Sequence, residues 1–164
     1  MVDAARLVAR LDQAGLVALD TSPFIYHLED VAPYSDLTLG LFQWIGKSGG
    51  HAVTSTLTLL EVLVGPYRAR DEARVNEFYA RLTTFPHLDW LPPTLEIADR
   101  AAGLRAAHGL RVPDAIQLAT ARASGAKLFL TNDKRLPSFD DVEVVMLDAF
   151  LPRPRQNPRP PCNA

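Results

Sequence analysis

A chain of 164 residues, with a mass of 18.0 kDa and a composition that is 48% hydrophobic and 22% charged, excludes a disordered protein and leaves room for one compact domain but not for two. The net charge of −2 and the pI of about 6.1 argue against binding nucleic acid through a broad basic face, although they are compatible with a small basic rim. No apolar run reaches the roughly 18 residues that a membrane-spanning helix needs, and the N-terminus carries charges where a signal peptide is apolar, so we expect a cytoplasmic protein without a membrane segment.

Helical and strand patterns alternate along the chain. Helices are indicated by apolar residues at every third or fourth position, and buried strands by short apolar runs between turn residues. In chain order, the expected elements are a helix at 3–13, a strand at 16–19, helices at 22–28 and 36–45, a strand at 51–55, a helix that follows this strand and stops at Gly65 and Pro66, a helix at 71–82, a strand at 87–91, helices at 93–107 and 113–123, and strands at 127–131 and 142–147. Such alternation implies right-handed crossovers, and it predicts an α/β fold, a three-layer α/β/α sandwich around a mostly parallel sheet.

The chain divides into three parts. We predict an N-terminal helical extension at residues 1–15, a single folded domain at 16–150, and a tail at 151–164. The tail is rich in proline and arginine, so we expect it to be disordered or polyproline-like, with its arginines either solvated or in contact with a partner. The only cysteine, Cys162, lies in this tail, and it can form neither an intramolecular disulfide nor a cysteine-based metal site.

One charged residue interrupts the apolar run L-T-L-L-E-V-L-V-G at residues 57–65. This residue is Glu61, on the helix expected after the second strand. An ionised carboxylate that is buried without a partner costs several kcal/mol, so such a group is usually paired, hydrogen-bonded or bound to a metal. Glu61 could also lie on a partly exposed helix face, or pair with an arginine such as Arg111.

Three further carboxylates lie where a ligand site is expected. Asp20 directly follows the first strand, Asp133 closely follows the strand at 127–131, and ligands of parallel sheets bind beyond the carboxyl ends of the strands. Asp114 stands just inside Pro113 at the start of an apolar helix. Each has a simpler interpretation, because aspartates commonly open turns and complement helix dipoles.

Taken together, these residues lie in stretches that closely resemble the motifs of a known family, the PIN domain. The stretches, in chain order, are D-T-S, T-L-T-L-L-E-V-L-V-G, R-V-P-D-A-I-Q-L-A-T-A and L-F-L-T-N-D-K-R-L. The resemblance covers residues 16–147, and it implies the ribonuclease fold of VapC-type toxins from bacterial toxin–antitoxin modules. Residues 16–150 would then be a PIN-like nuclease domain. The catalytic and metal-binding residues that the resemblance implies are Asp20, Glu61, Asp114 and Asp133.

The chemistry of this set is consistent with a metal-dependent nuclease. Carboxylate oxygens suit hard cations such as Mg²⁺ or Mn²⁺, and a cation would explain the charge of Glu61. The ion would stabilise charge on an RNA phosphodiester and lower the pKa of a bound water, and one carboxylate could take that water's proton. Four further residues are placed to hydrogen-bond the carboxylates, although simple turn chemistry explains them equally well; these are Thr21, Ser22, Thr131 and Asn132.

The chain departs from the family pattern just after the fourth acid. Many relatives have another acid two places further on, where this chain has Arg135, and an aromatic residue next, where it has Leu136. The departure puts a second metal ion in doubt. Lys134 and Arg135 could instead contact the RNA backbone, or they could simply be solvated.

Other functions have less support in the sequence than a ribonuclease has. The D-T-S stretch resembles that of haloacid-dehalogenase phosphohydrolases, but their second aspartate is missing because Ser22 stands in its place. The G-K-S at 46–48 lacks the earlier glycine of a phosphate-binding loop. A non-catalytic PIN-like module that binds RNA or protein would be expected to lose one of the four acids. A VapC-like toxin further implies an RNA substrate, a homodimer and a small antitoxin whose C-terminal segment blocks the acidic cleft.

Overall fold

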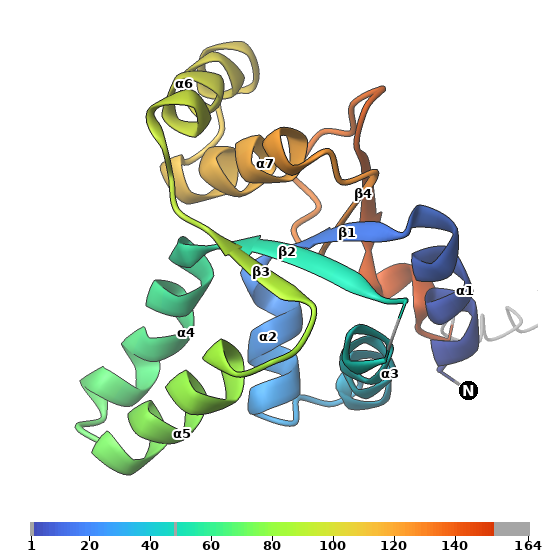
Figure 1. Cartoon of the computed structure of the whole chain (residues 1–164), viewed down its shortest axis with the longest axis vertical. Helices are drawn as coiled ribbons and strands as arrows, with labels where there is room; N and C mark the ends of the chain where they lie inside the picture. The colour runs from blue at the N-terminus through green and yellow to red at the C-terminus, as the bar shows by residue number, and fades with distance from the viewer. Residues whose placement is uncertain (1, 48, 153–164) are drawn as a thin grey trace, which may run out of the picture.

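A five-stranded parallel sheet forms the centre of the molecule. The computed structural model describes residues 2–47 and 49–152, and the strand order in this part of the chain is β3-β2-β1-β4-β5 (Figure 1). The central strands are continuous apolar runs because helices cover both of their faces. The strands are β1 (Leu16–Leu19), β2 (His51–Ser55), β3 (Leu88–Leu91), β4 (Leu128–Thr131) and β5 (Glu143–Met146).

Helices cover both faces of this sheet, which confirms the predicted three-layer α/β/α fold. Figure 1 shows α6 and α7 on one face, and the other helices lie mainly on the opposite face. The helices are α1 (Ala4–Ala14), α2 (Thr21–Leu28), α3 (Ser35–Gly46), α4 (Thr56–Arg68), α5 (Glu72–Thr83), α6 (Leu95–His108) and α7 (Val112–Ser124). A short 3₁₀ helix, Leu147–Phe150, was not anticipated from the sequence.

The predicted end of α4 at Gly65 and Pro66 was wrong. The helix continues through both residues to Arg68. Proline lacks one backbone donor, but near a helix end it removes only its own bond, and the turn closes through the amide of Ala69 on the carbonyl of Gly65 at 3.0 Å. Pro66 is also buried, so its ring contributes apolar contacts that favour the helical path.

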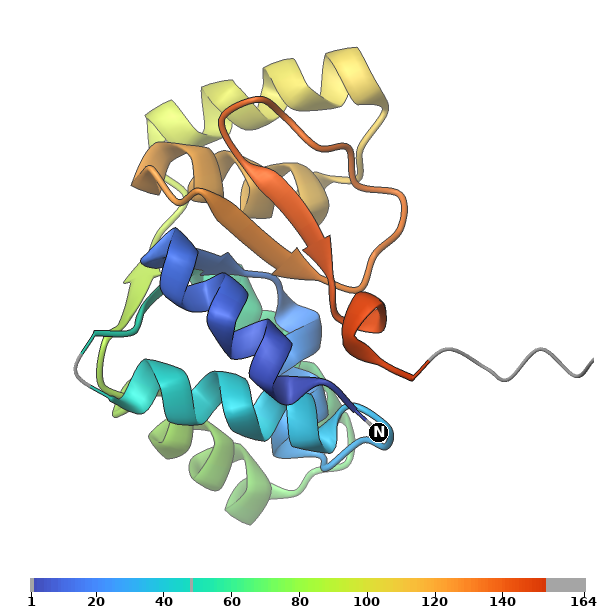
Figure 2. The ribbon, with the colours of Figure 1, turned by 90° about the vertical axis from the view of Figure 1, so that its right-hand side faces the viewer.

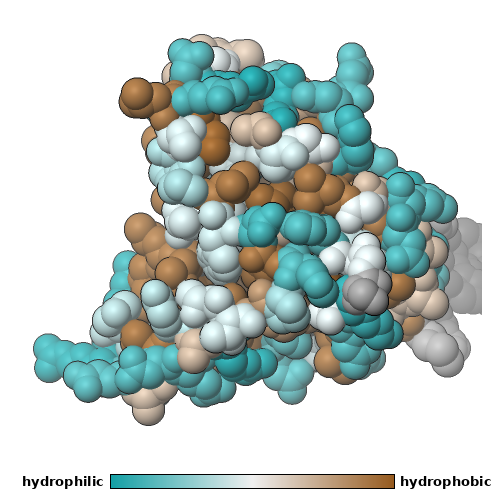
Figure 3. All heavy atoms as spheres, in the orientation of Figure 1, coloured by the Kyte–Doolittle hydropathy of each residue, from teal (hydrophilic) through white to brown (hydrophobic). Residues whose placement is uncertain are grey.

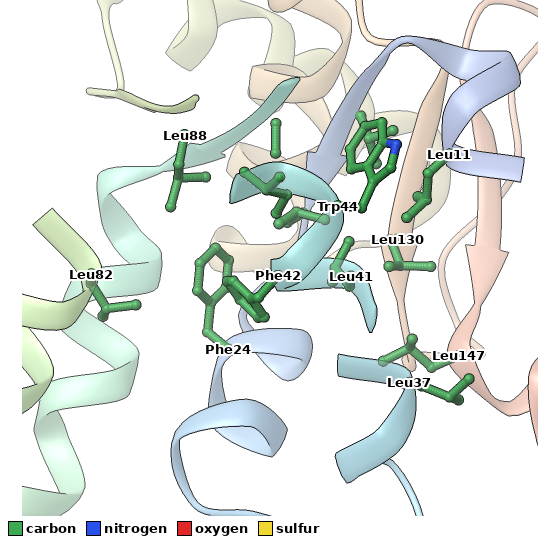
Figure 4. Packing of buried hydrophobic residues seen from close by; sticks show 14 of the residues in the cluster. Leu11, Phe24, Leu37, Leu41, Phe42, Trp44, Leu82, Leu88, Leu130 and Leu147 are labelled. Carbon is green, nitrogen blue, oxygen red and sulfur yellow. The ribbon is translucent and has the colours of Figure 1, made fainter. Parts of the chain in front are cut away.

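The N-terminal helix α1 is part of the main hydrophobic core. Leu7 and Leu11 are fully buried in the cluster that also contains Phe24 and Phe42. Figure 2 shows α1 lying along α3, and Figure 4 shows Leu11 among the side chains of this core. The Trp44 indole donates a hydrogen bond from Nε1 to Oδ1 of Asp12 at 2.7 Å, which fixes α1 on α3.

One apolar groove runs along the outer side of α4. Its lining includes Leu60 and Tyr67, which are 60% and 64% exposed. Figure 3 shows hydrophobic residues gathered on this side of the molecule. Large exposed apolar residues that lie together are typical of surfaces that contact other molecules.

Some predictions fall outside the described residues. Those for the tail from residue 153 onward, including the one for Cys162, cannot be compared with the fold. Among residues 2–47 and 49–152, no helix combines the length and the apolar character needed to cross a membrane.

Candidate active site

A pocket of about 420 Å³ lies at the carboxyl edge of the sheet. All four acids singled out in the sequence line it, and each comes from a different segment of the chain. Asp20 follows β1, Glu61 belongs to α4, Asp114 lies in the first turn of α7, and Asp133 follows β4. The two central strands therefore deliver two of the acids, and helices on opposite faces of the sheet deliver the other two.

Asp20 lies deepest in the fold, between β1 and α2. Its amide donates to the carbonyl of Leu130 at 3.0 Å, and Thr131 Oγ1 donates to its Oδ2 at 2.6 Å. Burial raises the pKa of the Asp20 carboxyl, and the nearby charges of Glu61 and Asp114 add to the rise. These effects outweigh the hydrogen bonds from the Thr131 side chain and the Thr21 backbone, so the pKa of the Asp20 carboxyl lies above its usual value.

Glu61 is held by a buried network of hydroxyl and amide groups. Thr21 Oγ1 donates to Oε2 of Glu61. Behind Thr21, the amide of Gln117 donates to Thr58 Oγ1 at 2.8 Å and to Thr21 Oγ1 at 3.4 Å. Thr58 also contacts Thr54 Oγ1 at 2.7 Å. Glu61 therefore lines the pocket with a hydroxyl partner. Arg111, the arginine that the sequence offered as a partner for Glu61, binds Asp114 instead.

Arginines neutralise the other two acids. Arg111 makes two hydrogen bonds to Asp114, of 2.8 and 3.1 Å, and so does not pair with Glu61. Arg135 binds Asp133 through both its backbone amide and its guanidinium group, and these contacts lower the pKa of the Asp133 carboxyl. Each arginine also lies 3.8 Å from the other's aspartate, so the four groups form one ion-pair cluster at the pocket rim.

Of the four predicted hydrogen-bonding residues, two contact the site carboxylates and two do not. Thr21 and Thr131 donate to Glu61 and Asp20, as described above. Ser22 Oγ instead accepts from the backbone amide of Asn132 at 3.2 Å. The Ser22 and Asn132 side chains therefore shape the loop after β4 rather than the acids.

Asn132 does not bind the site carboxylates as expected, because its side chain binds the carboxylate of Asp148 instead. Its Nδ2 donates to Oδ1 of Asp148 at 3.1 Å and to the hydroxyl of Tyr34 at 3.0 Å. Hydrogen bonds from Tyr34 and Lys134 lower the pKa of Asp148 to about 2, so it is an ionised acceptor. Lys134 lies 2.9 Å from Asp148, and in this arrangement it is an ion-pair partner rather than a free cation.

Sequence reasoning missed the residues beneath Glu61. Thr58 precedes Glu61 by three positions and Gln117 follows Asp114 by three, and residues three apart share one face of a helix. Both are polar positions inside otherwise apolar helices, which is the signal that drew attention to Glu61 itself. The contacts of Gln117 with Thr58 and Thr21 could not be read from the sequence, because α7 meets α4 and α2 only in the fold.

The donor set of the pocket suits a hard divalent cation. Four carboxylates offer oxygen ligands of the kind that Mg²⁺ and Mn²⁺ prefer. As the side chains lie, however, residues 2–47 and 49–152 contain no group of three or more acidic, histidine or cysteine side chains close enough to hold a metal ion. Like charges repel and two of the acids are turned toward arginines, so the ligands would have to converge when an ion binds.

The chain shares its fold with solved structures of toxins. A toxin–antitoxin complex from Klebsiella pneumoniae is 23% identical, with a TM-score of 0.59 over 77% of this chain and 94% of that one. VapBC2 from Rickettsia felis, bound to a DNA fragment from its promoter, is 16% identical, with a TM-score of 0.62 over 80% and 98%. VapC20 from Mycobacterium tuberculosis, a toxin that cleaves the sarcin–ricin loop, is 20% identical, with a TM-score of 0.52 over 69% and 86%. No curated protein gave a significant match.

The four acids line one pocket at the carboxyl edge of a parallel α/β/α sheet. The family model of the PIN domain matches residues 17–143. The chain therefore belongs to the PIN domain family, as the four motifs predicted.

Proposed function

We propose that this protein is a metal-dependent endoribonuclease, a VapC-like toxin that hydrolyses RNA phosphodiester bonds with Mg²⁺ or Mn²⁺. The observation that carries the proposal is that Asp20, Glu61, Asp114 and Asp133, from four separate segments, line one pocket. Membership of the PIN family supports it, and so does the fold shared with VapC toxins, one of which cleaves the sarcin–ricin loop.

Different acids have different tasks in this proposal. Asp20 and Glu61 would hold the ion, because their partners are hydroxyl groups and no arginine neutralises them. When bound, the ion polarises the phosphodiester and lowers the pKa of a coordinated water. Asp114 and Asp133 are the other two acids that line the pocket. One of the four carboxylates takes the proton of the attacking water.

The arginines favour a single divalent ion. Four carboxylates carry four negative charges, and the guanidinium groups of Arg111 and Arg135 balance two of them. The remaining charge matches that of one divalent cation. Arg135 stands where many relatives have an acid, so this chain carries a fixed positive charge where they could bind a second ion.

Replacing Arg135 by alanine should therefore tighten Mn²⁺ binding. A unit positive charge about 6 Å from a divalent ion in water opposes it by roughly 1.4 kcal/mol, so we expect about tenfold tighter binding in isothermal titration calorimetry. The matched control is Arg100→Ala on α6, which removes an arginine paired with Glu96 at 3.0 Å. Unchanged or weaker binding in Arg135→Ala would contradict the charge argument.

Cleavage of an RNA pool tests the proposed activity. The purified protein is incubated with single-stranded and structured RNA in Mn²⁺, Mg²⁺ or EDTA, beside an Asp114→Asn variant. We expect metal-dependent cleavage that falls at least about 100-fold in the variant, the lower end of what a positioned acid–base group contributes. If the wild type and the variant are equally inert, and metal titration shows no binding that depends on Asp114, the protein is better described as a non-catalytic PIN-like module that binds RNA or protein.

The partners follow from the same proposal. Because the similar structures include VapBC complexes, we propose a small antitoxin as the partner of this cytoplasmic protein, and a homodimer as its assembly. A gene for a small DNA-binding protein directly beside this one would support the toxin assignment. A different gene neighbourhood would favour a nuclease outside a toxin–antitoxin module.

A further inference from the structure

We propose that Gln117 is a positioning residue that directs the Thr21 hydroxyl at Glu61 and so holds that carboxylate ready for the metal ion. The inference rests on the proposed function, because it assigns Glu61 to an ion. Gln117 is 2% exposed, on the buried side of α7 beneath the pocket. It contacts none of the four acids through a hydrogen bond, and therefore acts on the site only through other side chains.

The direction of each hydrogen bond in the network follows from counting protons. The only proton of Thr54 Oγ1 goes to the carbonyl of Leu19 at 2.9 Å. Thr54 must therefore accept from Thr58, which lies 2.7 Å away and has only one proton to give. The single proton of Thr21 is likewise used, because an ionised Glu61 can only accept. The hydroxyl groups of Thr58 and Thr21 already donate their only protons, so toward Gln117 their oxygens can only accept.

Only the amide nitrogen of Gln117 can face these two oxygens. Its two N–H groups donate to Thr58 and to Thr21, at 2.8 and 3.4 Å. With the side-chain amide reversed, its carbonyl oxygen would meet two acceptors and no proton. In this orientation Gln117 Oε1 is buried without a hydrogen-bond partner. The two hydrogen bonds to the threonines therefore outweigh the cost of one unsatisfied buried acceptor.

Through this network, a residue of α7 sets the orientation of a hydroxyl group that binds a carboxylate of α4. By donating to one lone pair of the Thr21 oxygen, the Gln117 amide favours the orientation in which the Thr21 proton points at Glu61. Without the amide, the Thr21 hydroxyl is free to rotate toward other acceptors. Glu61 would then be held only by its own rotamer, against the repulsion of neighbouring Asp20.

A leucine at position 117 tests the inference, because it fills nearly the same volume without a donor. In full-length Gln117→Leu, we expect Mn²⁺ to bind about 10- to 100-fold more weakly in titrations followed by electron paramagnetic resonance, the range seen when a partner of a metal ligand is removed. Thr21→Val should weaken binding to a similar extent. The double variant should show no further loss, because both changes break one path.

Thr120→Val is the matched control. Thr120 lies on the same helix, is 1% exposed, and its Oγ1 also has no hydrogen-bond partner, but it does not touch the network. The variant should bind Mn²⁺ like the wild type. Wild-type affinity in Gln117→Leu, or losses that add in the double variant, would overturn the inference.

A second readout does not depend on metal binding. A crystal structure of metal-free Gln117→Leu is expected to show Glu61 without its hydrogen bond from Thr21. If that hydrogen bond persists unchanged, Gln117 does not position Glu61. A wild-type protein that binds no Mn²⁺ would count against the proposed function, and this structure would still decide the role of Gln117.

Discussion

Replacing Asp20 by asparagine is expected to abolish RNA cleavage while making the metal-free protein more stable. The carboxylate lies in the fold with hydrogen bonds but without a cation, and burial raises its pKa because the charged form is disfavoured there. Asparagine keeps the shape and an oxygen that can accept from Thr131, so it removes the charge without losing that contact. It also removes a ligand that the proposed ion needs.

The two effects are measured separately. We expect cleavage to fall at least about 100-fold. The thermal midpoint in EDTA should rise by roughly 2–4 °C, the shift that about 1 kcal/mol produces in a domain of this size. Asp99→Asn, an exposed aspartate on α6, should change neither quantity. A less stable Asp20→Asn protein in EDTA would show that the carboxylate is not an unbalanced charge, and retained cleavage would remove Asp20 from the proposed mechanism.

Truncating Phe24 to alanine is expected to cost about 3–5 kcal/mol of unfolding free energy. Phe24 is fully buried beside Phe42 (Figure 4), and the two ring centroids lie 5.3 Å apart in an edge-to-face arrangement. The ring of Trp90 lies 6.0 Å from that of Phe24. Such a loss is a large part of the roughly 5–15 kcal/mol that stabilises a typical domain. Because Phe24 lies on α2 close to Thr21, the pocket should loosen together with the core.

Urea unfolding followed by circular dichroism measures this loss. Tyr79→Ala on α5 serves as the control, because this aromatic residue is 51% exposed and its truncation should cost less than about 0.5 kcal/mol. A loss below about 1 kcal/mol in Phe24→Ala would mean that the neighbouring rings close the cavity, and it would remove α2 packing as the main support of the pocket.

The positions of the elements could be predicted because local patterns determine them. A short apolar run between turn residues, such as the one in β4, favours a buried strand, and aspartates at 20 and 133 follow strands whose carboxyl ends meet at one edge of a parallel sheet. The end of α4 could not be predicted, because the burial of Pro66, which favours the helical path, depends on residues that are not its neighbours in the sequence.

The sequence by itself determined the class of fold, since periodicity is a local property, and its resemblance to the PIN domain pointed to the four acids that line the pocket. Only the tertiary structure decided what meets each acid: a threonine hydroxyl for Glu61, and arginines for Asp114 and Asp133. The contact between Gln117 and Thr21 joins residues 96 positions apart. Hydrogen bonds depend on distance and direction in space, which no pattern of neighbouring residues specifies, so these partners emerge only when the sheet and its helices are assembled.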